Sequence, residues 1–252
     1  MRNDDAKQVN GWAVLYVTYP DGRRRTLAEA YDTRTWPSAK GTSTSAAPAP
    51  QAATHDRPQP TVPARRDDLE RLGVFCLEGE WEARLDDRLS VEPMLQMLEQ
   101  LAVIRFIRRD AATDVELEHY LSRWRRYGSY RLLYLGFHGE RDWLKVQPEG
   151  VTLDWLEDRL NGAADGRTIH FGSCSVLDLP PERLARFCRQ TGARGISGYC
   201  RAIDWLDSVA FELALVQALQ QRPERPSYAY RFMHDFYGDQ ARVLGFVHHP
   251  NP

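Results

Sequence analysis

Apolar runs and amphipathic segments alternate along the chain from residue 72 onward. The apolar runs are rich in β-branched and aromatic residues and predict strands at residues 73–78, 103–107, 131–137, 167–172 and 193–199. Between them, apolar residues recur at helical spacing, and one such stripe consists of Val91, Met94, Leu95, Leu98 and Leu101. This alternation predicts an α/β fold, with a parallel sheet covered by helices on both faces.

Capping residues mark where the predicted helices begin. Ser90 precedes the first helix, and Thr113 with Glu116 forms a capping box before the second. Asp204 precedes a long apolar helix, and residues 142–147 predict a small hairpin arm. Since crossovers between parallel strands are right-handed, we expect the flavodoxin-like strand order 2-1-3-4-5, in which the third and fourth strands are neighbours.

Composition divides the chain into three parts. Residues 1–36 hold a β-prone run, a turn and a possible return strand, which predict a short hairpin-like segment. Residues 37–66 are rich in Pro, Ala, Ser and Thr and predict a disordered linker. The α/β domain then occupies residues 67–252, where residues 227–237 predict a last helix and residues 242–247 an edge strand.

Bulk charge and cysteine content exclude several classes of protein. The net charge of −2 predicts no binding to nucleic acid or to anionic membranes. No apolar run is long enough for a transmembrane helix, and the charged N-terminus lacks the apolar core of a signal peptide, so we expect a cytoplasmic protein. The four cysteines form no CxxC pair and no zinc-type cluster, which predicts free thiols, no metal and no cofactor.

Two of the predicted strands end at a reactive side chain. The third strand runs into His138-Gly139, and the fourth runs into Ser173-Cys174. If both strands belong to one parallel sheet, these side chains emerge side by side at its carboxyl edge, where open α/β sheets bind ligands. A cysteine beside a histidine is a nucleophile beside its base, which predicts nucleophilic catalysis by Cys174 with His138.

The glycine and the small residues around this pair suit the same chemistry. Gly139 lets the backbone approach closely, so that its N–H and the N–H of Cys174 could hold a developing oxyanion. Gly172 and Ser173 leave room for a substrate chain. The sequence therefore predicts a peptidase that acts on a protein or peptide.

At these residues the chain resembles the caspase-like (clan CD) peptidases, which include caspases, metacaspases, separases and the bacterial CHAT peptidases. LLYLGFHG and TIHFGSC match the two halves of that site in order and spacing, and the resemblance covers about residues 72–221. It implies a caspase-like fold, a cytosolic endopeptidase with a Cys174–His138 dyad, and a role in bacterial stress, defence or regulated death. The caspase signature Q-A-C-x-G and an obvious processing linker between a large and a small subunit are both absent here, which argues against caspase-type specificity for Asp and against maturation by cleavage.

Acidic residues near the sheet edge are candidates for substrate recognition. Asp204 and Asp207 follow the fifth strand, where a helix N-cap and a first-turn acid are the simpler explanation, but they could also face a basic substrate side chain. Glu78 and Asp110, at the ends of the first two strands, are weaker candidates of the same kind.

The alternative to an enzyme is a catalytically inactive caspase-like adaptor. In that case the N-terminal region would bind a regulatory partner, and Cys174 would be an ordinary thiol. The other candidate side chains have structural explanations: we expect Cys76 and Cys188 in the core, and His170 as a buried, hydrogen-bonded histidine.

Overall fold

A computed structural model of the chain describes residues 16–18, 24–26, 71–82, 86 and 88–251. The chain divides into two compact units, Met1–Pro58 and Gln59–Pro252, which are described separately. In the first unit, β1 (Tyr16–Thr18) pairs antiparallel with β2 (Arg24–Thr26), as in a hairpin. The turn of that hairpin and the predicted linker lie outside the described residues, and the domain boundaries stay predictions.

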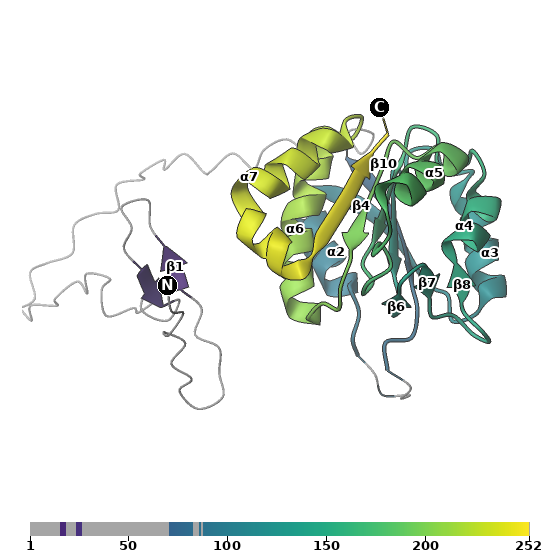
Figure 1. Cartoon of the computed structure of the whole chain (residues 1–252), viewed down its shortest axis with the longest axis horizontal. Helices are drawn as coiled ribbons and strands as arrows, with labels where there is room; N and C mark the ends of the chain where they lie inside the picture. Colours follow the sequence, from purple (N-terminus) through teal and green to yellow (C-terminus); the bar gives the residue numbers. More distant parts are fainter. Residues whose placement is uncertain (1–15, 19–23, 27–70, 83–85, 87, 252) are drawn as a thin grey trace, which may run out of the picture. The chain divides into compact units, whose positions relative to one another are not determined.

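A six-stranded sheet forms the centre of the second unit, with the order β11-β10-β9-β5-β3-β4 (Figure 1). Its strands are β3 (Leu72–Glu78), β4 (Ile104–Asp110), β5 (Leu132–Gly136), β9 (Thr168–Phe171), β10 (Gly195–Tyr199) and β11 (Phe246–Pro250). The first five are parallel, and β11 pairs antiparallel with β10 at one edge. Taken in chain order, the parallel strands have the predicted arrangement 2-1-3-4-5, so the α/β fold prediction is confirmed.

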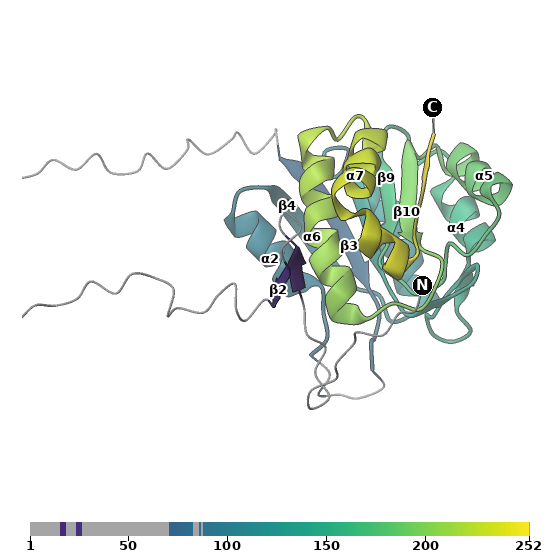
Figure 2. The same cartoon turned by 60° about the vertical axis from the view of Figure 1, so that its left-hand side comes forward.

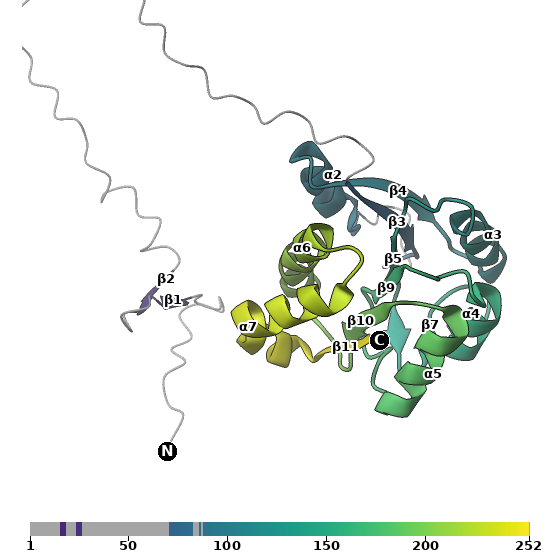
Figure 3. The ribbon, with the colours of Figure 1, turned by 90° about the horizontal axis from the view of Figure 1, so that it is seen from above.

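Helices cover both faces of this sheet (Figures 1, 2 and 3). One face carries α3 (Asp114–Trp124), α4 (Leu153–Leu160) and α5 (Pro181–Thr191). The other face carries α2 (Glu92–Gln100), α6 (Trp205–Gln221) and α7 (Pro226–Leu244). Each face has its own core, because the four inner strands are buried on both sides, as their unbroken apolar runs predict.

The predicted capping box forms at the start of α3, and a glycine ends α5. The Thr113 hydroxyl accepts from the Glu116 backbone N–H, and the Glu116 carboxylate accepts from the Thr113 N–H, which completes the capping box. Gly192 ends α5 at a φ of 79°, a left-handed conformation that favours glycine.

The first predicted helix differs at both ends. Leu101 is 66% exposed, because α2 ends at Gln100 and the last member of the apolar stripe falls outside it. Ser90 lies one residue before the N-cap, Val91; its hydroxyl accepts from Glu92 N–H and donates to Glu78.

The C-terminal elements also differ from the prediction. Helix α7 extends to Leu244 with a break at Tyr237, and Gly245 ends it at a φ of 64°. The edge strand therefore begins at Phe246 rather than at residue 242 and contains His248, whose ring stacks on Tyr230 at 4.6 Å. His248 and His249 thus belong to the sheet, opposite Ser197 and Ile196 of β10.

A small antiparallel sheet replaces the predicted hairpin arm after the third large strand. It consists of β6 (Gly139–Glu140), β7 (Trp143–Leu144) and β8 (Val151–Thr152). Throughout the part of the chain that the structure describes, no helix is long and apolar enough to cross a membrane.

Candidate active site

The strand ends that carry the predicted dyad are neighbours. Strands β5 and β9 pair in parallel with Leu135 opposite Phe171, and Gly172 N–H donates to the Leu135 carbonyl at 2.9 Å. The buried Ser173 hydroxyl accepts from Phe137 N–H at 3.2 Å and lies 3.3 Å from the Leu135 carbonyl. The segment before Cys174 is therefore fixed to the segment before His138.

Gly139 brings the two strand ends into direct contact. A Cβ atom built on this glycine would lie 2.7 Å from the Cys174 carbonyl oxygen and 2.4 Å from a methyl carbon of Val176. Real Cβ atoms do not approach other atoms so closely, so the position requires glycine. The Ser173-Cys174 segment packs against the backbone that follows His138, as the sequence predicts.

His138 is exposed, and its imidazole is oriented by Trp81. The two rings meet edge to face at 5.5 Å between centroids, and Nε2 of His138 is hydrogen-bonded to the Trp81 carbonyl oxygen. Because a carbonyl oxygen only accepts, Nε2 must carry the proton, which leaves Nδ1 of a neutral imidazole with its lone pair. The His138 carbonyl in turn accepts from Lys145 N–H at 2.8 Å.

Trp81 was not predicted as a site residue, and a buried carboxylate holds it in place. Its indole N–H donates to Glu78 at 2.6 Å, and Glu78 also accepts from Ser90 and from Val91 N–H. Arg108 pairs with the same carboxylate at 2.7 Å. Burial lowers the pKa of Arg108, but the hydrogen bond and charge of Glu78 more than offset this, so the pKa of Arg108 is raised.

This network gives two candidates for substrate recognition a structural explanation. Glu78 is fully buried, so its carboxylate cannot meet a substrate. Asp110 is exposed but pairs with Arg108 at 2.6 Å. Both carboxylates instead bind Arg108 at the ends of β3 and β4, and Glu78 also holds Trp81 against His138.

Cys174 is partly exposed, and its sulfur contacts the segment that follows β10. Its Sγ accepts from Ile203 N–H at 3.5 Å and lies 4.0 Å from the Ile203 carbonyl. The next residue, Ser175, has a φ of 57° and donates its N–H to the Arg201 carbonyl at 3.0 Å. Among the described residues, no hydrogen bond joins the Cys174 thiol to the His138 imidazole.

Asp204 and Asp207 lie next to this thiol contact, and both are exposed. The Asp204 carboxylate accepts from the N–H groups of Leu206 and Asp207, at 2.9 and 3.0 Å, and so caps α6. Asp207 falls in the first turn of that helix. The structural explanation of Asp204 as an N-cap is therefore correct, and a role in recognition stays a prediction.

The other thiols have different surroundings. Cys76 and Cys188 are fully buried; burial raises the pKa of Cys188 to about 12 and that of Cys76 well above its usual range. A buried thiol of raised pKa is a poor nucleophile at neutral pH. Cys200, at the end of β10, is partly exposed like Cys174.

His170 belongs to a buried polar cluster and is not a second base at the sheet edge. Its Nδ1 lies 2.9 Å from the Ser197 hydroxyl, and its Nε2 lies 3.2 Å from the Glu212 carboxylate on α6. Glu212 also accepts from the hydroxyls of Tyr134 and Tyr199, at 2.5 and 2.9 Å. Every member is buried, so this cluster links three strands to α6 without reaching a substrate.

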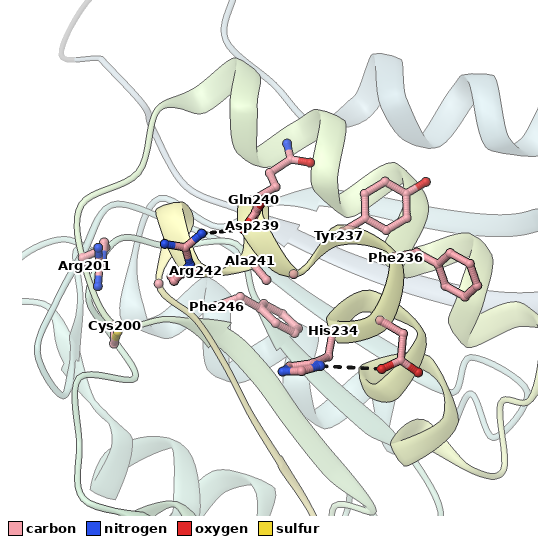
Figure 4. A pocket seen from close by; sticks show the side chains of 13 residues that line it. Cys200, Arg201, His234, Phe236, Tyr237, Asp239, Gln240, Ala241, Arg242 and Phe246 are labelled. Carbon is pink, nitrogen blue, oxygen red and sulfur yellow. Dashed lines mark hydrogen bonds and ion pairs between the residues drawn. The ribbon is translucent and has the colours of Figure 1, made fainter. Parts of the chain in front are cut away.

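A groove of about 910 Å³ opens beside the end of β10 (Figure 4). Cys200 and Arg201 form one side, and the broken second half of α7, around Tyr237, forms the other. Phe246 contributes apolar surface to its lining. Because the Arg201 carbonyl is bonded to Ser175, the groove begins next to the turn that carries the thiol.

Within the described ranges, no group of three His, Cys, Asp or Glu side chains is arranged to hold a metal ion.

A family profile matches residues 71–246, and its family is described as one of unknown function, DUF6642. The chain belongs to this family. No protein with a curated description matches the DUF6642 chain. Among solved structures, caspase-1 from Spodoptera frugiperda is similar to it, with 11% sequence identity and a TM-score of 0.47, over 72% of this chain and 87% of the caspase.

Proposed function

We propose that the chain is a cysteine endopeptidase with Cys174 as nucleophile and His138 as general base and acid. The observation that carries this proposal is the contact of Gly139 with the backbone of Cys174, which joins the two strand ends at one edge of the sheet. The bond between His138 and Trp81 adds to it, because it leaves Nδ1 as the proton acceptor. By resemblance to caspase-like peptidases, we further propose a cytoplasmic role in stress, defence or regulated death.

In the first half of the reaction, the Cys174 thiol loses its proton to Nδ1 of His138. The thiolate sulfur attacks the scissile carbonyl carbon, and the carbonyl oxygen becomes an oxyanion. The backbone N–H groups of Gly139 and Cys174 would hold this charge. The imidazolium then gives its proton to the leaving amine, the C–N bond breaks, and a thioester remains on Cys174.

In the second half, a water molecule gives a proton to His138 and attacks the thioester carbon. The C–S bond breaks, the carboxylic product leaves, and the proton returns to the sulfur. Neither half requires a redox partner or a cofactor. The carbonyl of Trp81 serves both halves of the reaction, because it accepts a hydrogen bond from Nε2–H of His138 and so stabilises the imidazolium.

Substrate recognition is proposed at the exposed carboxylates beside the thiol. Asp204 directly follows Ile203, whose N–H contacts the sulfur, and Asp207 lies one helical turn further on. We propose that these two carboxylates bind a basic side chain of the substrate. The groove beside Arg201 offers room for more of the bound peptide.

The rate of thiol alkylation as a function of pH tests the dyad. We expect Cys174 to react faster than Cys200 below pH 7, with the advantage lost in His138→Ala. His119→Ala is the matched control, because His119 is an exposed histidine on α3 and should leave the rates unchanged. Cys200 is the internal control, because it is a partly exposed thiol at the end of the neighbouring strand.

A Cys174 that reacts like Cys200 in all three proteins would contradict the dyad. The inactive adaptor would then be the better account, and the Ile203 contact would be the structural role of the thiol. Cleavage of an unfolded protein substrate by the wild type, and not by Cys174→Ala, would complete the case for a peptidase.

A further inference from the structure

Arginines line the amino edge of the sheet, at the opposite ends of the strands from Cys174. Arg131 immediately precedes β5, Arg167 precedes β9 and Arg194 precedes β10. The helices between parallel strands run back toward this edge, so their C-terminal carbonyl groups gather here. Those carbonyl groups carry partial negative charge, which favours arginine at this edge.

Hydrogen bonds show that several of these arginines do contact helix ends. Arg167 donates to the carbonyls of Trp124 and Arg125, at 2.9 and 3.1 Å, and its guanidinium lies over the Trp124 ring at 4.6 Å. Arg125 donates to the Asn161 carbonyl, just after α4, at 3.2 Å. A carbonyl group satisfies N–H donors but carries no net charge, so these hydrogen bonds leave the positive charge of the arginines in place. Asp165, an exposed carboxylate that attracts Arg167, offsets part of it.

The arginines form one continuous row through the backbone. Thr168 N–H donates to the Arg131 carbonyl, and Arg194 N–H donates to the Arg167 carbonyl, both at 2.8 Å. Together with the end of α3, this row makes an arginine edge, which consists of Arg123, Arg125, Arg126, Arg131, Arg167 and Arg194. Among the described residues, none of the six forms an ion pair with a carboxylate.

Several arginines elsewhere in the domain do form ion pairs. Arg108, Arg183 and Arg186 each pair with two or more carboxylates. Among the described residues, Arg189 and Arg231 also form no ion pair, so what sets the arginine edge apart is that six arginines gather along one edge of the sheet.

The surface is also concave and partly aromatic. A depression of about 480 Å³ lies between α3 and α4, with Arg125, Arg126 and Arg159 on its wall. Tyr127, which follows Arg126 in the chain, is 46% exposed. Glu118 and Asp158 line the same depression. The positive surface is thus interrupted by carboxylates.

We propose that the arginine edge is a docking surface for an acidic segment of a partner protein. Guanidinium groups bind carboxylates in a planar, two-bond geometry, and separate carboxylates along a peptide can avoid Glu118 and Asp158. A nucleic acid cannot do so, because its backbone carries a charge at every step along the strand. Tyr127 supplies apolar contact for an aromatic residue of the same segment.

This inference is independent of the proposed peptidase function. The surface lies at the amino ends of the strands, whereas Cys174 lies beyond a carboxyl end, so a bound partner leaves the thiol accessible. The edge can serve an enzyme as a second contact with its substrate protein, and it can serve an inactive adaptor as its main binding surface.

Fluorescence anisotropy with the full chain tests the proposal. The probe is a short fluorescein-labelled peptide that repeats Glu-Asp-Tyr-Gly, in about 0.15 M salt, where long-range charge effects are screened. The test variant combines Arg125→Gln, Arg126→Gln and Arg131→Gln. The control variant removes the same charge elsewhere through Arg88→Gln, Arg189→Gln and Arg231→Gln, three exposed arginines outside the edge.

We expect the test variant to bind the peptide at least about tenfold more weakly than the wild type, and the control variant to bind within about twofold of it. Equal losses in the two variants would mean non-specific attraction and would overturn the proposal. So would tighter binding of single-stranded DNA or of phosphatidylserine vesicles than of the peptide. Unchanged thermal unfolding of the test variant shows that the loss is not a loss of folding.

Discussion

Gly139 is the residue through which the two halves of the candidate site touch. In Gly139→Ala the added methyl would meet Val176 and the Cys174 carbonyl at distances that no folded protein tolerates. We expect a loss of about 1–3 kcal/mol in the free energy of unfolding, because the turn after Cys174 must move. Urea denaturation measures this loss, and the alkylation rate of Cys174 should fall with it.

Gly128→Ala is the matched control for this substitution. A Cβ atom there meets nothing within 4 Å, and the residue is exposed. We expect its unfolding free energy to change by less than about 1 kcal/mol. Equal effects of the two substitutions would show that the contact between the strand ends is not tight.

Asp204 allows its charge to be separated from its role as a helix cap. Asp204→Asn keeps a good N-cap for α6 but removes the charge, whereas Asp204→Ala removes both. If the carboxylate binds a basic substrate side chain, kcat/KM for peptides cleaved after Arg or Lys should fall about tenfold in both variants. Only the Ala variant should lose about 1 kcal/mol of stability. Unchanged cleavage by the Asn variant would exclude Asp204 from recognition.

The sequence predicts that His138 and Cys174 lie at one edge of the sheet, but not that Trp81 orients the imidazole of His138. Their place could be predicted because each follows an apolar run, and neighbouring parallel strands end at the same edge. Trp81 acts through its backbone carbonyl, a group that every residue has, so no residue type marks it. Its position just after the first strand is the one signal that could have suggested it.

At the scale of elements, a charge network on α5 holds the small sheet after His138. Arg183, on α5, lies 2.9 Å from Asp154 and 3.5 Å from Asp142 and is bonded to the nearly buried Glu157. Asp142 N–H in turn donates to Val176, two residues after the thiol. Through Asp142, α5 is therefore linked to the segment after His138 and to the turn after Cys174.

Arg183→Met should therefore destabilise the domain. We expect a loss of about 2 kcal/mol in the free energy of unfolding, because the nearly buried Glu157 carboxylate loses one of its two cation partners and retains Arg186 alone. Arg189→Met, on the exposed side of the same helix, should change it by less than about 0.5 kcal/mol. Chemical denaturation of the two variants decides whether the network contributes to stability.

The long apolar runs made most helices and strands predictable. The predictions that failed concern very short strands and one apolar run that could be either helix or strand. Strands β6, β7 and β8 have two residues each, too few for any period to appear. The run from Arg242 to Val247 is apolar enough for a strand, but its first part continues α7. Gly245 marks the true boundary, and a glycine within an apolar run is compatible with either structure.

For the whole molecule, buried acids predict how stability depends on pH. Burial raises the pKa of Cys188 to about 12 and keeps the pKa of Tyr134 and Tyr199 well above their usual range. In the unfolded chain these groups ionise at about pH 8.5 for the thiol and about pH 10 for the phenols. Above these values the folded state binds more protons than the unfolded state, so stability is complete below about pH 8 and falls as pH rises.

Thermal unfolding between about pH 7 and pH 10.5, under reducing conditions, measures this dependence. We expect the melting temperature to decline above about pH 8.5, and to decline less steeply in Cys188→Ala, which lacks one of the buried acids. A melting temperature that stays constant over this range would contradict the burial of these groups.

Glu212 also bears on how the chain is completed during synthesis. The strands that carry Tyr134, His170 and Tyr199 leave the ribosome before the carboxylate that accepts from all three. Until α6 emerges, the two tyrosine hydroxyls and Nε2 of His170 lack the carboxylate that they contact in the folded domain, so burying them without water is unfavourable. A polypeptide released before residue 212 would therefore stay open on one side, exposed to proteolysis.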